Sequence, residues 1–80
     1  MNIQIINVIE VNNGIADAPE SFVIYEEQLS QDVIDAAQKL FTELALEHGM
    51  EEEYTDQCID NGYYDNNSGY EVMINWSNVN

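Results

Sequence analysis

The sequence predicts an α+β domain in which one long helix packs on one face of an antiparallel sheet of about four strands. β-Branched and aromatic residues gather near both ends of the chain, and a long segment between them has helical periodicity. Turn signals separate these segments, so the predicted order of elements is β-β-α-(α)-β-β. The chain has 80 residues, enough for one domain only, which we place at residues 1–80.

The first strand is predicted from Ile3 to Val11, a run dominated by β-branched side chains, which favour an extended backbone. Alternation along the run separates the two faces of the pleat. Asn7 interrupts the more apolar face, whereas Gln4 and Glu10 lie on the opposite one. The apolar residues of the first face are Ile3, Ile5, Ile9 and Val11.

A turn signal from Asn12 to Gly14 and a loop from Asp17 to Pro19 follow the first strand. The second strand is predicted from Ser21 to Glu27, because the residues at its centre are aromatic or β-branched. We expect this strand to run antiparallel to the first.

The long helix is predicted from Gln31 to His48, where apolar residues recur every three or four positions. Ser30 is a suitable N-cap residue. Gly49 has the position of a C′ residue, after which Met50 is expected to fold back onto the last turn. The stripe that would cover the sheet consists of Val33, Ile34, Ala37, Leu40, Phe41, Leu44 and Ala45.

The segment from Glu51 to Asn61 fits two structures. The spacing of Tyr54, Cys58 and Ile59 indicates a short helix that ends at Gly62. Alternation of polar and apolar residues in the same segment would suit a strand instead. We favour the helix.

A C-terminal hairpin is predicted, because the turn cluster from Asp65 to Gly69 separates two runs of β-forming residues. Trp76 is expected to contribute to the core. The residues from Ser77 to Asn80 are expected to form a polar tail. The residues of the last strand that share one face are Tyr70, Val72, Ile74 and Trp76.

The charge of the chain is strongly unbalanced: sixteen acidic residues stand against one basic residue, Lys39, and the formal net charge is −15. Such a field opposes compaction and favours association with positively charged surfaces. It argues against direct binding to nucleic acid or to an anionic membrane. Selection for a basic partner explains this bias, and adaptation to high salt or to solubility alone is the alternative.

The sequence also bears on location and assembly. No apolar run is long enough to span a bilayer, and the N-terminus lacks the positive region of a signal peptide. Cys58 is the single cysteine, so no internal disulfide is expected. We therefore expect a protein of the reducing cytoplasm, as a monomer or a small homo-oligomer.

Few residues could carry catalysis or bind a metal. His48 is expected to cap the end of the helix, where a cationic imidazole is favourable. Cys58 lies among carboxylates, which suppress the reactive thiolate, so we expect it to fill space in the core. The run from Asp60 to Glu71 has the length of an EF-hand loop, but Gly62 and Tyr64 stand where that loop needs oxygen ligands. The sequence thus predicts no enzyme, no metal site and no cofactor.

An acidic surface is the candidate for function. Acidic residues lie opposite the apolar stripe of the helix, and a second acidic run follows Gly49. Glu47 stands at the negative end of the helix dipole, where an anion is unfavourable, so solubility alone does not explain its position. Tyr54 lies within the second run and is of a residue type that anchors interfaces. The candidate partner-binding residues are Asp32, Asp35, Glu43, Glu47, Glu51, Glu52, Glu53, Tyr54, Asp56 and Asp60.

A short acidic chain with a sheet, one long acidic-faced helix and no catalytic set resembles the phage-encoded DNA-mimic inhibitors, with the anti-CRISPR proteins ranked first among them. The resemblance covers size, charge and element order over the whole chain, without a shared residue motif. It implies an inhibitor whose carboxylates occupy phosphate sites on a basic nucleic-acid-binding complex in the cytoplasm of a bacterial host cell. The partner that it favours is a CRISPR–Cas effector. Lys39 departs from this pattern, because it interrupts the acidic row on the helix.

Two other functions fit the same charge. An immunity protein or antitoxin would neutralise a basic nuclease toxin by the same electrostatics, and an adaptor subunit would be acidic for solubility alone. For an inhibitor, reversing the charges from Glu51 to Glu53 should weaken binding more than changing Asp17 or Glu20. An adaptor should keep its function when its surface charge is neutralised.

Overall fold

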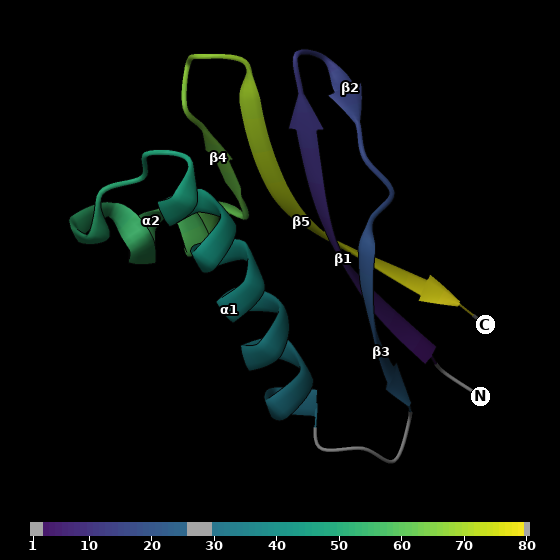
Figure 1. Ribbon diagram of the computed structural model, residues 1–80. Coiled ribbons are helices and arrows are strands. Elements are labelled where there is room, and N and C mark those ends of the chain that lie inside the picture. The colour runs from purple at the N-terminus through teal and green to yellow at the C-terminus, as the bar shows by residue number, and fades with distance from the viewer. Residues whose placement is uncertain (1–2, 26–29, 80) are drawn as a thin grey trace.

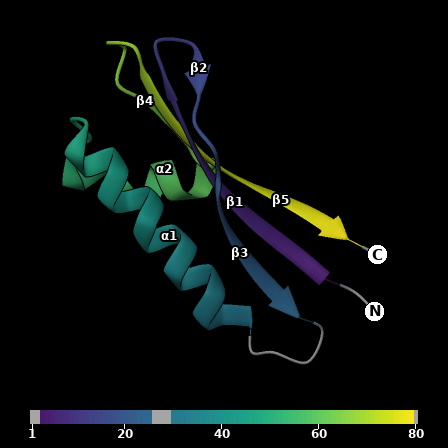
Figure 2. The same cartoon turned by 45° about the vertical axis from the view of Figure 1, so that its right-hand side comes forward.

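The computed structural model describes residues 3–25 and 30–79, which form two layers (Figure 1). One layer is an antiparallel sheet of five strands, and the other consists of a long helix and a short one on the same side of that sheet (Figure 2). This confirms the predicted α+β fold. The strands are β1 (Ile3–Asn12), β2 (Ile15–Ala16), β3 (Glu20–Tyr25), β4 (Tyr63–Asp65) and β5 (Tyr70–Val79), and the helical segments are α1 (Ser30–Glu47), the 3-10 turn η1 (Glu52–Tyr54) and α2 (Thr55–Asn61).

β1 and β5 form the centre of the sheet and pair along their whole length, from Ile3 opposite Val79 to Asn12 opposite Tyr70. β2 and β3 pair with the other edge of β1, and β4 pairs with the beginning of β5. The expectation of a polar tail is wrong for residues 77–79, which belong to β5. The ladder to β1 uses backbone groups, so it does not require apolar side chains.

β2 forms a short hairpin with the end of β1, in the region predicted as turn and loop. Asn12 pairs with Ile15, and the residues between them, Asn13 and Gly14, have positive φ angles of 52° and 82°. A two-residue type I′ turn requires positive φ at both positions, and Asn-Gly is its preferred sequence. The sequence predicts this turn. It does not predict β2, because two paired residues are too few to show the alternation of a strand.

The core lies between α1 and the sheet. Ala37, Phe41 and Ala45 project from one side of α1 and are fully buried, as the helical periodicity predicts. They pack against buried residues of three strands and against Met50, which follows the helix. The buried sheet residues are Ile6, Val8, Ile24, Tyr70 and Val72.

α1 covers the face of β1 that carries Gln4, which is the less apolar of the two faces. Ile6 and Val8 lie on this covered face and are only 1% and 2% exposed. In the ladder Ile6 lies opposite Phe22 of β3, and Val8 lies opposite Ile74 of β5, so the neighbouring strands complete an apolar surface. The composition of β1 alone therefore does not indicate which face is buried.

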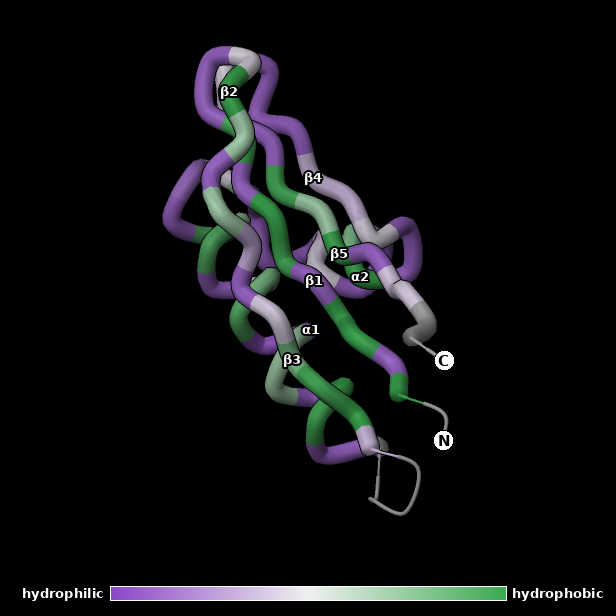
Figure 3. Tube along the Cα trace, turned by 90° about the vertical axis from the view of Figure 1, so that its right-hand side faces the viewer, coloured by the Kyte–Doolittle hydropathy of each residue, from purple (hydrophilic) through white to green (hydrophobic). Residues whose placement is uncertain are grey.

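The other side of the sheet lies away from both helices, and Figure 3 views the molecule from this side. We call the part of it on β1, β3 and β5 the open face. Its side chains are half-buried or exposed, and the one charged residue among them is Glu71, opposite Val11 at the corner beside the β4–β5 turn, with Asp65 of β4 next to it. The uncharged residues of the open face are Ile3, Ile5, Asn7, Ile9, Val11, Ser21, Val23, Tyr25, Met73, Asn75 and Ser77.

α1 ends in a Schellman motif, as Gly49 and Met50 predict. Gly49 has a φ angle of 104°, which a residue without a side chain adopts readily. Its N–H donates to the Leu46 carbonyl at 3.4 Å, and the Met50 N–H donates to the Ala45 carbonyl at 3.0 Å. This turn directs the chain from the end of α1 into η1 and buries Met50 against the core.

The segment after the Schellman motif is helical, which confirms the favoured prediction of a short helix and not a strand. Gly62 ends α2 with a φ angle of 66°, and its N–H donates to the Cys58 carbonyl at 2.8 Å. The expectation that Trp76 packs in the core is wrong, because it is 52% exposed. β4 pairs only with residues 71–73, so Trp76 lies on a part of β5 that has no neighbouring strand on that edge.

Parts of two predictions lie outside the described residues. The predicted N-cap is the side chain of Ser30, which the structure does not describe, and the predicted end of the second strand includes Glu26 and Glu27. Among the helices of the described ranges, none combines the length and the apolar character needed to cross a membrane.

Candidate acidic interface

Some of the candidate acidic residues lie along α1, on the side that faces away from the sheet. We call them the α1 row: Asp32, Asp35, Glu43 and Glu47. All of them are exposed, whereas the residues on the opposite side of the helix are buried. Lys39 is also exposed and stands between Asp35 and Glu43, as the sequence predicts. The row is therefore a surface feature whose negative charge is interrupted near its middle.

The other candidate residues follow α1 in the chain. We call them the η1–α2 cluster: Glu51, Glu52, Glu53, Tyr54, Asp56 and Asp60. All of them are exposed, and Tyr54 is 51% exposed. Asp56 and Asp60 are one turn apart on α2, so their Cβ atoms are about 6 Å apart. Cys58 lies between them in the sequence, but it packs at the edge of the core. No basic residue interrupts this cluster.

The α1 row and the η1–α2 cluster adjoin at the C-terminal end of α1. Only the Schellman turn separates Glu47 from Glu51, and this end of the helix has the negative pole of the helix dipole. Asp32 is about 22 Å away from Glu47 along the helix axis. The structure therefore brings together the candidate residues from Glu47 onward and leaves Asp32 and Asp35 at the far end of α1.

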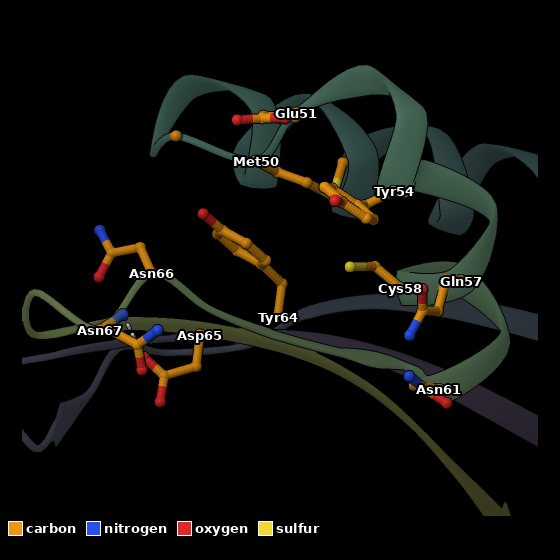
Figure 4. Close-up of a pocket in the computed structure, with 11 residues that line it drawn as sticks. Met50, Glu51, Tyr54, Gln57, Cys58, Asn61, Tyr64, Asp65, Asn66 and Asn67 are labelled. Carbon is orange, nitrogen blue, oxygen red and sulfur yellow. Dashed lines mark hydrogen bonds between the residues drawn. The ribbon is translucent and has the colours of Figure 1, made fainter.

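A pocket of about 380 Å³ opens between α2 and the segment that joins β4 to β5 (Figure 4). Two candidate residues, Glu51 and Tyr54, line it. Figure 4 shows the Cys58 thiol and the Tyr64 ring pointing toward the space between the two segments. The pocket thus places a carboxylate and two aromatic rings around one opening beside the acidic surface.

Hydrogen bonds hold the β4–β5 wall of the pocket against the end of α1. Asn66 Nδ2 and the Tyr64 hydroxyl both donate to the His48 carbonyl, at 3.3 Å and 3.4 Å. Asn66 Oδ1 accepts the backbone N–H groups of Ser68 and Tyr70, at 2.8 Å and 3.1 Å. Desolvation raises the pKa of Tyr64 above its ordinary value of about 10, and its hydroxyl is a donor at neutral pH in either case. Because these bonds lie within the chain, this wall of the pocket is formed without a bound partner.

His48 caps the end of α1, as the sequence predicts. Its Nδ1 lies 2.8 Å from the Leu44 carbonyl, which can only accept, so Nδ1 is the donor. The hydroxyl of Tyr70, whose ring contacts the imidazole, donates to the Glu10 carboxylate at 2.7 Å. Burial raises the pKa of Tyr70, and the hydrogen bond to Glu10 raises it further. His48 therefore has a structural role at the junction of α1 with the sheet.

Most acidic residues outside the candidate set are used by the fold. Glu10 and Glu71 accept hydrogen bonds from tyrosine hydroxyls. Asp17 accepts a hydrogen bond from an asparagine side-chain amide, and Asp65 accepts one from a backbone N–H. Within the candidate set, Asp35 accepts a hydrogen bond from a glutamine one turn earlier. In the described part of the chain, the exposed charge is thus concentrated on α1, η1 and α2.

Tyr64 and Asn66, which form the pocket wall, were not among the predicted site residues. Both lie in the predicted hairpin, and only the packing of that hairpin on the end of α1 brings them close to Glu51 and Tyr54. Within residues 3–25 and 30–79, no three His, Cys, Asp or Glu residues are grouped so as to hold a metal ion. Comparisons with protein-family models, curated proteins and solved structures found no match to this chain.

Proposed function

We propose that this protein is a non-enzymatic inhibitor that presents the α1 row and the η1–α2 cluster to a basic nucleic-acid-binding complex. The observation that carries the proposal is the division of the acidic residues. Those of the two groups are exposed on the helical layer, whereas four of those elsewhere accept hydrogen bonds within the fold. Nine of the sixteen acidic residues belong to these two groups, and this concentration of negative charge on one layer steers association toward a basic groove and raises the rate of encounter.

The mechanism that we propose is occlusion by phosphate mimicry. Neighbouring carboxylates on a helix are about 6 Å apart, a spacing close to that of successive phosphates on one strand of a duplex. Asp56 and Asp60 have this spacing on α2, and they continue the charge of Glu51, Glu52 and Glu53. Because Lys39 interrupts the α1 row, the η1–α2 cluster is the centre of the proposed interface.

The pocket beside the cluster gives the interface an anchor point. An Arg or Lys side chain of the partner would enter it, with its charge near the Glu51 carboxylate and against the ring of Tyr54. Tyrosine and arginine are the residue types that contribute most at the centre of interfaces. The pocket therefore supplies a specific contact that diffuse charge attraction does not.

The target class that we propose is a CRISPR–Cas effector in the cytoplasm of a bacterial host cell, with target-DNA binding as the blocked step. Support comes from the resemblance in size, charge and element order to anti-CRISPR proteins. A basic nuclease toxin, as the partner of an immunity protein, is the other target with the same electrostatics.

The first experiment is a pull-down of the tagged chain from nuclease-treated host lysate, eluted along a salt gradient and identified by mass spectrometry. We expect one stoichiometric nucleic-acid-binding complex that target DNA displaces. Recovery of a toxin nuclease would instead indicate that the chain is an immunity protein. A mixture of basic proteins that leaves at low salt would overturn the inhibitor proposal.

Single charge reversals then locate the interface. Glu52→Lys in the η1–α2 cluster and Glu20→Lys on β3 make the same change in net charge, and both positions are exposed. We expect Glu52→Lys to weaken binding to the recovered complex about tenfold or more and Glu20→Lys to have a much smaller effect. Equal losses would mean that only net charge matters. Tyr54→Ala tests the pocket separately, because it leaves the charge unchanged.

A further inference from the structure

The open face is an apolar surface that the proposed function does not use. Antiparallel sheets with one solvated side usually alternate apolar residues inward with polar residues outward. β1 departs from this rule, because Ile5, Ile9 and Val11 lie on the side that neither helix covers. Val23 of β3 and Met73 of β5 extend the apolar area on both sides of β1. An uncovered surface of this kind marks a place of association.

The distribution of charge selects the occupant. The open face carries one charged residue among its described side chains, Glu71 at one corner, so it offers little to the basic partner that the helical layer attracts. A second copy of this highly acidic chain would be repelled from any approach to the helical layer. Contact through the two open faces keeps both helical layers outside and places together the surfaces with the fewest charges. The face is therefore suited to another copy of the same chain.

A polar row at the centre of the open face separates two apolar areas. Ser21 Oγ donates to Asn7 Oδ1 at 2.7 Å, and Asn7 Nδ2 donates to Asn75 Oδ1 at 3.5 Å. On β1 two apolar residues lie on each side of Asn7: Ile3 and Ile5 toward one end, Ile9 and Val11 toward the other. A two-fold axis at Asn7 would place Ile3 and Ile5 of one copy against Val11 and Ile9 of the other and the reverse, which is the reciprocal contact of an isologous interface.

We propose that two copies of this chain pack face to face through their open faces, with the two-fold axis near Asn7. β1 and β5 have ten residues each and β3 has six, so at roughly 3.3 Å per residue and about 4.8 Å between strands they give roughly 400 Å² per copy. The total of about 800 Å² from both copies is smaller than a standard interface, so we expect a weak dimer that forms at high protein concentration.

The dimer does not depend on the proposed function, and salt separates the two. Apolar burial between two negatively charged copies is opposed by repulsion, which salt screens, so dimerisation strengthens as salt increases. Binding of the acidic layer to a basic partner weakens under the same change. The dimer also directs two acidic layers outward, so a complex with two basic grooves is bound through both copies.

Sedimentation velocity of the full chain tests the dimer, from about 1 µM to about 500 µM protein and in low and high salt. We expect the mass to rise from 9.1 kDa to twice that value as the protein concentration increases. In high salt the rise should begin at a lower protein concentration. Ile9→Glu buries a carboxylate at the interface and should weaken dimerisation roughly a hundredfold or more. Ile15→Glu is the matched control: Ile15 is 71% exposed and lies on the other side of the sheet.

Val23→Glu, on an exposed position of β3, repeats the test in case Ile9→Glu disturbs the fold. A cooperative unfolding transition identifies the variants that remain folded. A wild-type chain that stays monomeric over the whole range would overturn the proposal. A dimer that survives in folded Ile9→Glu and Val23→Glu would overturn it as well and would move the contact to a strand edge.

Discussion

The imidazole of His48 lies flat against the ring of Tyr70, with ring centroids 3.5 Å apart and planes 3° from parallel. His48 also bonds to the Leu44 carbonyl in the last turn of α1, and Tyr70 bonds to Glu10 of β1. One stacked pair thus joins the end of the helix to both central strands. This junction lies directly behind the point where the α1 row meets the η1–α2 cluster.

Replacing Tyr70 by Phe should preserve the stack and remove the hydrogen bond to Glu10. The Glu10 carboxylate is half-buried, so it would lose a charged hydrogen bond that water only partly replaces. We expect the free energy of unfolding at neutral pH to fall by about 1–2 kcal/mol. Urea denaturation of both proteins measures this difference. Glu10→Gln can still accept the bond, so it should lose less than Tyr70→Phe.

The same tyrosine should make the fold sensitive to high pH. Burial and the bond to Glu10 raise the pKa of Tyr70 in the folded state above its ordinary value of about 10. Below pH 10 both states hold the phenol proton, and stability does not depend on this group. Above pH 10 the unfolded chain releases it first, so the free energy of unfolding falls as pH rises. Tyr63 acts in the same direction, because its hydrogen bond to Glu71 raises its pKa to about 12.

Denaturation midpoints between about pH 9 and pH 11 test this effect. Tyr70→Phe should show a shallower decline than the wild type, since it lacks the group whose pKa is most strongly raised. Parallel declines in the two proteins would assign the alkaline sensitivity to other groups.

Local signals in the sequence predict the helix and its ends. The apolar stripe of α1 is buried as expected, and Gly49 followed by Met50 indicates the Schellman motif that the structure contains. The exposure of the α1 row follows from the same periodicity, because these residues lie opposite Phe41. The features that could be predicted from the sequence are therefore those that depend on residues within one or two helical turns of each other.

Features that depend on distant segments could not be predicted in the same way. Both faces of β1 carry apolar residues, and only the burial of Ile6 and Val8 in one cluster with Phe41 shows which face meets α1. Glu51 and Tyr64 line one pocket because the β4–β5 hairpin bonds to the His48 carbonyl at the end of α1, and no spacing in the sequence indicates that contact.

Replacing Gly49 by Ala should weaken the junction between α1 and η1. At a φ angle of 104° a Cβ atom is strained, although the nearest atom, the Tyr64 hydroxyl, would be 3.6 Å from it. The cost therefore comes from the backbone and not from a clash, and we expect about 1–2 kcal/mol of lost stability. Thermal denaturation measures it. Gly49→Asn should lose less, because Asn tolerates positive φ better than Ala. Equal losses for Ala and Asn would contradict this reason.

Neighbouring isoleucines on β1 should differ in their contributions to stability. Ile6 is buried under α1, so Ile6→Ala should cost about 2–5 kcal/mol. Ile5 lies on the open face and is only half-buried, so Ile5→Ala should cost about 1 kcal/mol in the monomer. Urea denaturation at low micromolar protein concentration measures both variants without a contribution from self-association. A larger loss for Ile5→Ala would mean that the covered face has been assigned wrongly.

Lys39 should stabilise the fold at low salt because its neighbours on α1 are acidic. Asp35 and Glu43 each lie one turn away, and Lys39→Glu converts two attractive pairs into two repulsive ones. We expect a loss of about 1 kcal/mol in low salt, half of it for Lys39→Gln, and a much smaller loss in high salt. The wild type should itself become more stable as salt increases, since its net charge of −15 repels itself. A loss that salt does not change would assign the effect of Lys39 to the packing of its aliphatic stem.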